Sequence, residues 1–174
     1  MSNPVLEAIA QRRSNRGYEA RPLSTAQIDA LLKAAVESPS ANNAQPWHFT
    51  VVRDAALLAE INAEASQRLG RNLADIFFGA PVVIFISADP SSRWGRLDSG
   101  VAVENIALAA QGLGLGSVIL GLPDAAFTGP KGPDFARRLK FPEGHRFAVA
   151  IAVGYPTVTK EAHPVAEGRI DFVE

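Results

Sequence analysis

Residues 81–89 read PVVIFISAD, a nearly unbroken apolar run rich in β-branched side chains. A strand with one face in water alternates polar and apolar residues, so a continuous apolar run predicts a strand buried on both faces. The stretch FAVAIAV, residues 147–153, has the same character. A sheet built from such strands needs a cover on each side, which limits the chain to a layered fold of helices and strands.

Residues typical of helix ends indicate where the helices around these strands begin and stop. Ser24 and Gln27 form a capping box before an amphipathic stretch that Pro39 ends. Residues 101–113 are apolar nearly all round and predict a central, buried helix. We expect helices over residues 4–12, 24–38, 54–70, 101–113 and 134–139, and strands over 49–52, 81–89, 117–122 and 147–153; the alternation of the tail 168–174 could add an edge strand. Together they predict a single α+β domain over residues 1–174, with a mixed sheet covered by helices.

Composition excludes several functional classes. The 174 residues carry a formal net charge of −1 and no cysteine, so they offer no global attraction to nucleic acid and no thiolate, disulfide or iron–sulfur chemistry. The three histidines, His48, His145 and His163, lack the spacing of metal ligands, and we expect no metal site. No apolar run approaches the roughly 20 residues of a membrane span. We therefore expect a cytoplasmic protein that binds neither nucleic acid nor membrane.

Residues 12–16, RRSNR, combine three arginines with Ser14 at the end of a predicted helix. Arginine side chains and a serine hydroxyl can together clamp a phosphate. Arginines at a helix C-terminus also complement the helix dipole without any ligand. On this segment alone the second reading is favoured.

The loop before the first predicted strand, ESPSANNAQPWHF at residues 37–49, is dense in polar and rigid residues. Its amides and hydroxyls could hydrogen-bond the edge of a polar, planar ligand, and its prolines would lower the cost of ordering the loop. The same residues could form a well-capped connector with Trp47 in the core. The loop alone favours neither reading.

The glycines of GLGLGSVILG, residues 112–121, do not form a dinucleotide-binding fingerprint. That fingerprint needs a strand before the glycines and a helix after them, and here the order is reversed. Gly121 differs from the others because it closes a predicted strand, where a missing side chain lets another group approach the backbone. That group is either a flat cofactor ring or a neighbouring helix.

The sequence shows no convincing serine–histidine–acid arrangement, paired-carboxylate signature or phosphate loop. An enzyme with this sequence would need a cofactor to carry its chemistry.

In chain order, the segments RRSNRGYEARPLS, ESPSANNAQPWHF, APVVIFIS, VENIALAAQGLGLGS, VILG and AVGYP, followed by a late arginine, resemble the FMN-dependent nitroreductase family. The resemblance covers nearly the whole chain. It implies a mainly antiparallel central sheet with helices on both sides, in a homodimer whose two FMN sites lie at the subunit interface. It also implies ping-pong hydride transfer from NADH or NADPH to FMN, and then to a nitroaromatic, quinone or similar small-molecule acceptor.

Other functions stay open at this point. Reduced flavin could serve dehydrogenation or reductive dehalogenation of a bound substrate. The protein could also hold FMN without catalysis, as a sensor or store, or be a structural domain without any cofactor.

The resemblance also implies which residues bind the cofactor, with flavin rather than a catalytic side chain carrying the chemistry. Arg12, Ser14 and Arg16 are implied to hold the FMN phosphate. Arg13 is implied to act there through its backbone or side chain, and Arg169 to join the phosphate site from the tail.

A second set of residues is implied to surround the flavin ring. Pro39, Ser40 and Asn42 would line the isoalloxazine from the partner subunit, and Gln45 would support their loop.

Three further positions match family segments near the ring. Asn72 resembles the asparagine near the pyrimidine side, and Leu120 and Gly121 match the segment whose backbone donates toward flavin N5. The lysine that some members place near flavin N1 has no clear counterpart after Asn72. The chain is short for the family, which leaves residues 122–140 to shape the substrate pocket.

Overall fold

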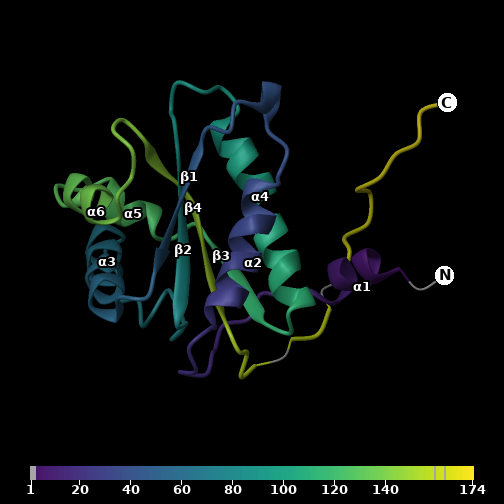
Figure 1. The fold of residues 1–174 in the computed structure, drawn as a ribbon, viewed down its shortest axis with the longest axis horizontal. Helices are drawn as coiled ribbons and strands as arrows, with labels where there is room; N and C mark the ends of the chain where they lie inside the picture. Colours follow the sequence, from purple (N-terminus) through teal and green to yellow (C-terminus); the bar gives the residue numbers. More distant parts are fainter. Residues whose placement is uncertain (1–2, 159, 163) are drawn as a thin grey trace.

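The computed structural model describes residues 3–158, 160–162 and 164–174, and its centre is a four-stranded antiparallel sheet in the order β1-β2-β4-β3. The strands are β1 (Trp47–Val52), β2 (Val82–Ala88), β3 (Gly116–Leu120) and β4 (Arg146–Gly154). The helices are α1 (Pro4–Gln11), α2 (Thr25–Val36), α3 (Ala55–Arg68), α4 (Gly95–Gly112), α5 (Asp124–Phe127) and α6 (Gly132–Arg138), with a 3-10 turn, η1, at Ala41–Asn43. Figure 1 shows helices on both sides of the sheet, which confirms the expected α+β architecture.

β2 lies inside the sheet, between β1 and β4, and is buried along its whole length. Its side chains alternate between two cores: Val83 and Phe85 belong to one, and Ile84 and Ile86 to the other. The apolar run of residues 81–89 thus reflects burial on both faces, as predicted.

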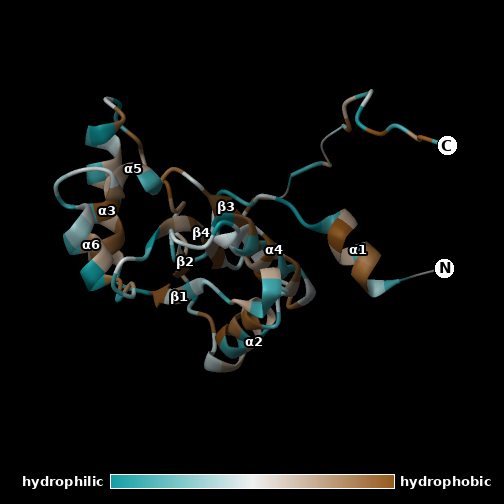
Figure 2. Cartoon of the chain, turned by 90° about the horizontal axis from the view of Figure 1, so that it is seen from above, coloured by the Kyte–Doolittle hydropathy of each residue, from teal (hydrophilic) through white to brown (hydrophobic). Residues whose placement is uncertain are grey.

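Each face of the sheet has its own core. α2 and α4 cover one face, where Leu31 and Ile106 are fully buried. α3, α5 and α6 cover the other face, where Ile61 and Phe135 are buried against Phe85 and its neighbours. The view from above in Figure 2 shows the same division, with α2 and α4 on one side and α3 and α6 on the other.

Three helices begin at the caps that the sequence predicts. The side chains of Asn3 and Asp54 accept hydrogen bonds from the first backbone N–H groups of α1 and α3, and Ser24 forms both bonds of its capping box before α2. α4 begins at Gly95, earlier than the sequence predicts. Its first turns contain Asp98 and other small or polar residues that sequence patterns assign to loops, and the packing of α4 on the sheet overrides that preference.

The sheet is antiparallel throughout its four strands, and the parallel pairing in the described residues is an isolated bridge between Ser14 and Ser117. The edge strand predicted in the tail is wrong. Residues 168–174 form no strand, and the tail runs away from the sheet past α1 (Figure 1). At the start of β3 the sheet edge is already occupied by Ser14 and the residue after it, so Ile170 and Phe172 cannot pair there.

Candidate functional site

Residues 12–16, the basic segment, leave α1 and lie along the edge of the sheet at the start of β3. Ser14 forms a parallel bridge with Ser117, and the backbone N–H of Asn15 donates to Ser117 O at 2.9 Å. Gly116 permits this close approach, since a Cβ there would lie 2.8 Å from Asn15 Oδ1. The basic segment is therefore held by the sheet and is more than a solvated helix end.

Tyr18 fixes the same segment from the core side. Its hydroxyl donates to Asn15 O at 2.8 Å and also lies 3.3 Å from Ala152 O. Burial raises the pKa of Tyr18 well above the ordinary value for tyrosine, so the hydroxyl stays protonated and keeps its role as a donor.

The three arginines of the basic segment have different surroundings. Arg12 Nε lies 3.2 Å from a carboxylate oxygen of Glu104 on α4. Arg16 is exposed, and its hydrogen bond to the backbone of Ser14 is long, at 3.5 Å. Arg13 turns back and donates from Nη1 to the backbone oxygens of Ala10, in the last turn of α1, and of Arg12, its C-cap, at 2.6 and 2.8 Å. Arg12 and Arg16 thus keep donors for a ligand, whereas Arg13 caps its own helix.

β3 connects the basic segment to Leu120 and Gly121. Ser117 pairs with Ser14, and Gly121 follows roughly 13 Å further along the extended chain. Leu120 is buried in the core, whereas Gly121 is exposed, and a Cβ at this glycine would meet nothing within 4 Å. The side of Gly121 on which a Cβ would stand is therefore uncovered in the described chain and leaves its backbone open to a flat group.

Residues 39–45, the polar loop, have a well-defined but strained backbone. Asn42, Asn43 and Gln45 have φ angles of 54°, 53° and 48°, in the left-handed region that residues with side chains disfavour. Gln45 N donates to Ser40 Oγ at 3.0 Å, and Gln45 Nε2 donates to Asn43 Oδ1 at 2.9 Å. Gln45 therefore supports the loop from within, while Asn42 and the proline at position 39 are exposed.

α4 anchors the polar loop through Asp98. The buried Asp98 carboxylate accepts from the backbone N–H of Ala41 at 3.3 and 3.4 Å. Arg12 meets the same helix at Glu104, about 9 Å further along the helix axis. Figure 1 shows η1 and α1 near opposite ends of α4. No hydrogen bond or ion pair of the described residues joins the polar loop to the basic segment within this one chain.

Two of the predicted site residues are not joined to the others by any hydrogen bond or ion pair of the described residues. Asn72 is exposed in the connection after α3, where the Asp75 carboxylate accepts from the backbone N–H groups of Phe77 and Gly79. Arg169 is exposed on the tail that runs past α1. No hydrogen bond or ion pair of the described chain brings Asn72 or Arg169 to the basic segment.

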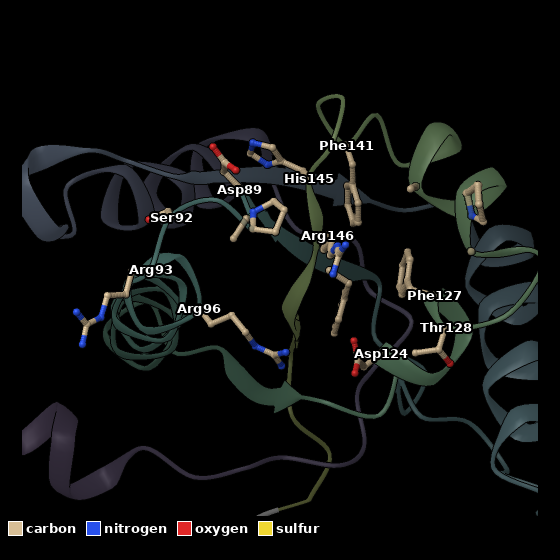
Figure 3. Close-up of a pocket in the computed structure, with 16 residues that line it drawn as sticks. Asp89, Ser92, Arg93, Arg96, Asp124, Phe127, Thr128, Phe141, His145 and Arg146 are labelled. Atoms are coloured by element: carbon tan, nitrogen blue, oxygen red, sulfur yellow. The ribbon is translucent and has the colours of Figure 1, made fainter.

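A cavity of about 750 Å³ opens where the β2–α4 connection, the start of β4 and the helices α5 and α6 meet (Figure 3). Its apolar wall includes Phe127, which stacks on Phe147 and Phe141 with ring centroids 5.0 and 5.6 Å apart. Its charged residues are Asp89, Arg93, Arg96, Asp124, His145 and Arg146. Sequence reasoning missed these residues because they come from separate segments and form no motif. Residues 122–140, which the resemblance left to shape a pocket, supply one wall.

His145, which lines the cavity, forms a small polar cluster with Ser87 and His48. His145 Nδ1 is 3.3 Å from Ser87 Oγ, and His48 Nδ1 is buried without a hydrogen-bond partner in the described chain. Burial, and then the nearby charge of His145, lowers the pKa of His48. Among the described residues, neither histidine has a hydrogen bond or an ion pair to a carboxylate, as a hydrolytic triad would require, and the Asp89 carboxylate near His145 accepts from Ser91 instead.

The described residues hold no group of histidine, aspartate or glutamate side chains that could bind a metal ion. His163 lies outside the described residues. In the part of the chain that the structure covers, none of the helices is both long and apolar enough to span a bilayer.

Known proteins resemble this chain over almost its full length. The model of the nitroreductase family matches residues 9–155. A provisionally named NADH dehydrogenase/NAD(P)H nitroreductase of Archaeoglobus fulgidus is 36% identical over 162 residues, which cover 90% of this chain and 87% of the relative. An iodotyrosine deiodinase of Thermotoga neapolitana is 30% identical over 179 residues, which cover 92% of each. The crystal structure of an FMN-bound nitroreductase from Desulfitobacterium hafniense DCB-2 has a TM-score of 0.93 to this chain, with 32% identity and 100% coverage of both.

Proposed function

Because this chain belongs to the nitroreductase family, we propose that it is a cytoplasmic FMN-dependent oxidoreductase that takes a hydride from NADH or NADPH and reduces a nitroaromatic, quinone or similar acceptor. The name of the Archaeoglobus relative supports the oxidoreductase class, and the FMN in the Desulfitobacterium structure supports the cofactor. The observation that carries the proposal is the arrangement along β3. The arginines of the basic segment lie beside its first residues, and the uncovered backbone of Gly121 follows its last residue.

The basic segment fits an FMN phosphate. A phosphate dianion needs cations with donors free to reach it, and Arg12, Arg16 and the hydroxyl of Ser14 meet that need on one rigid stretch. We assign Arg13 a supporting role through its backbone, because its side chain is used to cap α1. Arg169 would join the phosphate from the tail.

The other end of β3 fits a flavin ring. Gly121 leaves room for a flat group to lie against the backbone, and Leu120 fixes that backbone by its burial in the core. Asn72 would contact the pyrimidine side of the ring. FMN, when bound, would supply the hydride chemistry, so the protein needs only to bind the ring, orient it and limit the access of water.

We propose that the protein is a homodimer in which the polar loop of one subunit completes the site of the other. Pro39, Ser40 and Asn42 would then line the partner's flavin, while Asp98 holds the loop in shape. Exposed apolar side chains on α1, on the first half of α4 and in the tail support a second copy of the chain as the partner that covers them. They are Val5, Leu6 and Ile9 on α1, Trp94, Leu97 and Val101 at and along the first half of α4, and Ile170, Phe172 and Val173 in the tail.

A second candidate reaction is reductive dehalogenation of a bound aromatic substrate. The Thermotoga relative is named an iodotyrosine deiodinase and matches 92% of this chain. Both reactions would use the same FMN site, so the choice of acceptor separates them. Turnover of a halophenol in place of a nitroaromatic would favour this second function.

The absorption spectrum of the purified protein tests the proposal first. The protein is mixed with FMN, desalted, and then treated with NADH or NADPH without oxygen. We expect flavin bands that stay with the protein and bleach with one nicotinamide, which would also name the donor. Bands that stay but never bleach would favour a non-catalytic FMN-binding protein, and no retained flavin would overturn the proposed function.

A further inference from the structure

The cavity of Figure 3 begins where the proposed flavin platform ends. The backbone N–H of Asp124 donates to Gly121 O at 3.0 Å, so the turn that starts at Gly121 leads directly into the cavity wall. A volume of about 750 Å³ is within the range of small-molecule sites. A molecule in this cavity would therefore lie beside a ring at Gly121.

Two arginines face this cavity without a protein partner. Arg96 comes from the first turn of α4 and Arg146 from the first residue of β4, and Figure 3 shows both side chains directed toward the space above Asp124. Neither has an ion pair or a side-chain hydrogen bond among the described residues. By contrast, Arg138 on α6 is paired with both carboxylate oxygens of Glu60, at 2.7 and 2.9 Å.

The other charged groups of the cavity are already engaged or oppose an anion. Asp89 accepts from the backbone N–H of Ser91 at 2.8 Å, and Arg93 lies over the Trp94 ring at 4.8 Å. His145 is within hydrogen-bond distance of Ser87. Asp124 is the acid that lies with Arg96 and Arg146 and competes with an anionic ligand for them.

The rest of the cavity suits an aromatic body. Phe127 stands in the middle of a stack with Phe147 and Phe141, and this stack forms an apolar wall. A ligand with a flat ring would remove this wall from water, while an anionic substituent would meet the two arginines.

We propose that this cavity binds the electron acceptor, and that the acceptor is an aromatic compound whose carboxylate or sulfonate group is held by Arg96 and Arg146. The inference rests on the proposed function, because the acceptor must lie beside the flavin to receive the hydride. The inference adds that the acceptor is an anion, which membership of the nitroreductase family does not specify.

The test compares two acceptors with the same ring and the same reducible group, 4-nitrobenzoate and the neutral 4-nitrobenzyl alcohol. The FMN-loaded enzyme and the variants Arg96→Gln, Arg146→Gln and Asp124→Asn are compared by steady-state kinetics. Arg53→Gln is the matched control, because Arg53 is an exposed arginine at the far end of β1 and does not line the cavity.

Removal of either cavity arginine should raise the KM for 4-nitrobenzoate by about tenfold, as expected for one lost charge-assisted hydrogen bond. The KM for the neutral acceptor should change much less, and Asp124→Asn should lower the KM for 4-nitrobenzoate. Equal effects on both acceptors would overturn the proposal. A raised KM for NADPH with no change for 4-nitrobenzoate would also overturn it, since the anion recognised would then belong to the hydride donor.

Calorimetric titration of 4-nitrobenzoate, without nicotinamide, separates a failure of this inference from a failure of the proposed function. Weaker binding in Arg96→Gln and Arg146→Gln supports the anion site even in a protein that turns nothing over. Binding that is the same in both variants as in Arg53→Gln contradicts the site even if the enzyme is active with FMN.

Discussion

Arg12 Nε lies 3.2 Å from a carboxylate oxygen of Glu104, so an acid stands beside the guanidinium proposed to hold the FMN phosphate. Both side chains are partly exposed, and the ion pair itself contributes little to stability. Glu104 instead competes with the phosphate for Arg12. We expect Glu104→Gln to lower the Kd for FMN by about two- to fivefold, measured by fluorescence titration of the apoprotein.

Glu60→Gln is the control for that variant, because Glu60 pairs with Arg138 on the far side of the sheet. Its FMN Kd should equal that of the wild type. Weaker FMN binding after Glu104→Gln would show that Glu104 orients Arg12 for the phosphate and does not compete with it.

The arginines of the basic segment should separate into two kinds. Replacing Arg12 and Arg16 together by alanine should weaken FMN retention strongly and leave the unfolding midpoint in urea unchanged, because neither side chain holds the fold. Arg13→Ala should instead lower the free energy of unfolding by about 1–2 kcal/mol, since it removes hydrogen bonds to the end of α1. FMN retention equal to the wild type in the double variant would contradict the phosphate assignment.

The sequence predicts those parts of the fold that are determined by residues close together in the chain. The run at residues 81–89 marks a strand buried on both faces, and Ser24 marks a helix start whatever surrounds it. The start of α4 at Gly95 has no such local signal, because its first turns are helical through the packing of α4 on the sheet. The alternation in the tail predicts a strand, but residues 168–174 run away from the sheet past α1 and pair with none of its strands.

The candidate site also has parts that the sequence predicts and parts that only the folded chain shows. RRSNR and the polar loop are short motifs, so the sequence can point to both. Asparagine is typical of the left-handed backbone seen at Asn42 and Asn43, but the sequence does not say which asparagine adopts it, and the capping role of Arg13 leaves no pattern at all. The cavity of Figure 3 draws Arg96 and Arg146 from segments about 50 residues apart, so only the paired strands β2 and β4 bring them together.

Two glycines of the β3 region should respond to a side chain in opposite ways. A Cβ at Gly121 meets nothing within 4 Å, so Gly121→Val should leave the apoprotein stable while its branched side chain fills the space proposed for the ring. Gly116→Ala should lower the free energy of unfolding by about 1–3 kcal/mol, because its Cβ would lie 2.8 Å from Asn15 Oδ1 and from Pro156 Cβ. Full flavin occupancy in Gly121→Val would mean that the ring lies elsewhere.

Asp98 should control the shape of the polar loop. Asp98→Ala leaves the backbone N–H of Ala41 without its acceptor, whereas Asp98→Asn can keep one amide oxygen in the same place. We expect faster proteolysis within residues 39–45 and weaker FMN binding in the alanine variant, with partial rescue by asparagine. If both variants bind FMN as the wild type does, while the loop is cut faster, then the loop is not part of the flavin site.

His48 should make the protein less stable in mild acid. Its pKa is lowered, first by burial and then by the charge of His145, so the native state holds it neutral where the unfolded chain already binds a proton. Because the unfolded state then binds more protons, the free energy of unfolding rises with pH in this window. The contribution of His48 is fully present above the ordinary histidine pKa and is lost as pH falls through the native pKa.

Urea unfolding at a series of pH values between about 7 and 5 measures this effect. The midpoint of the wild type should fall as the pH drops, and His48→Gln should reduce that fall because no proton can bind at residue 48. His145→Gln should also reduce it, since the neighbouring charge that lowers the pKa of His48 is gone. An equal fall in all three proteins would mean that other groups, and not the half-buried His48, set the acid limit of the fold.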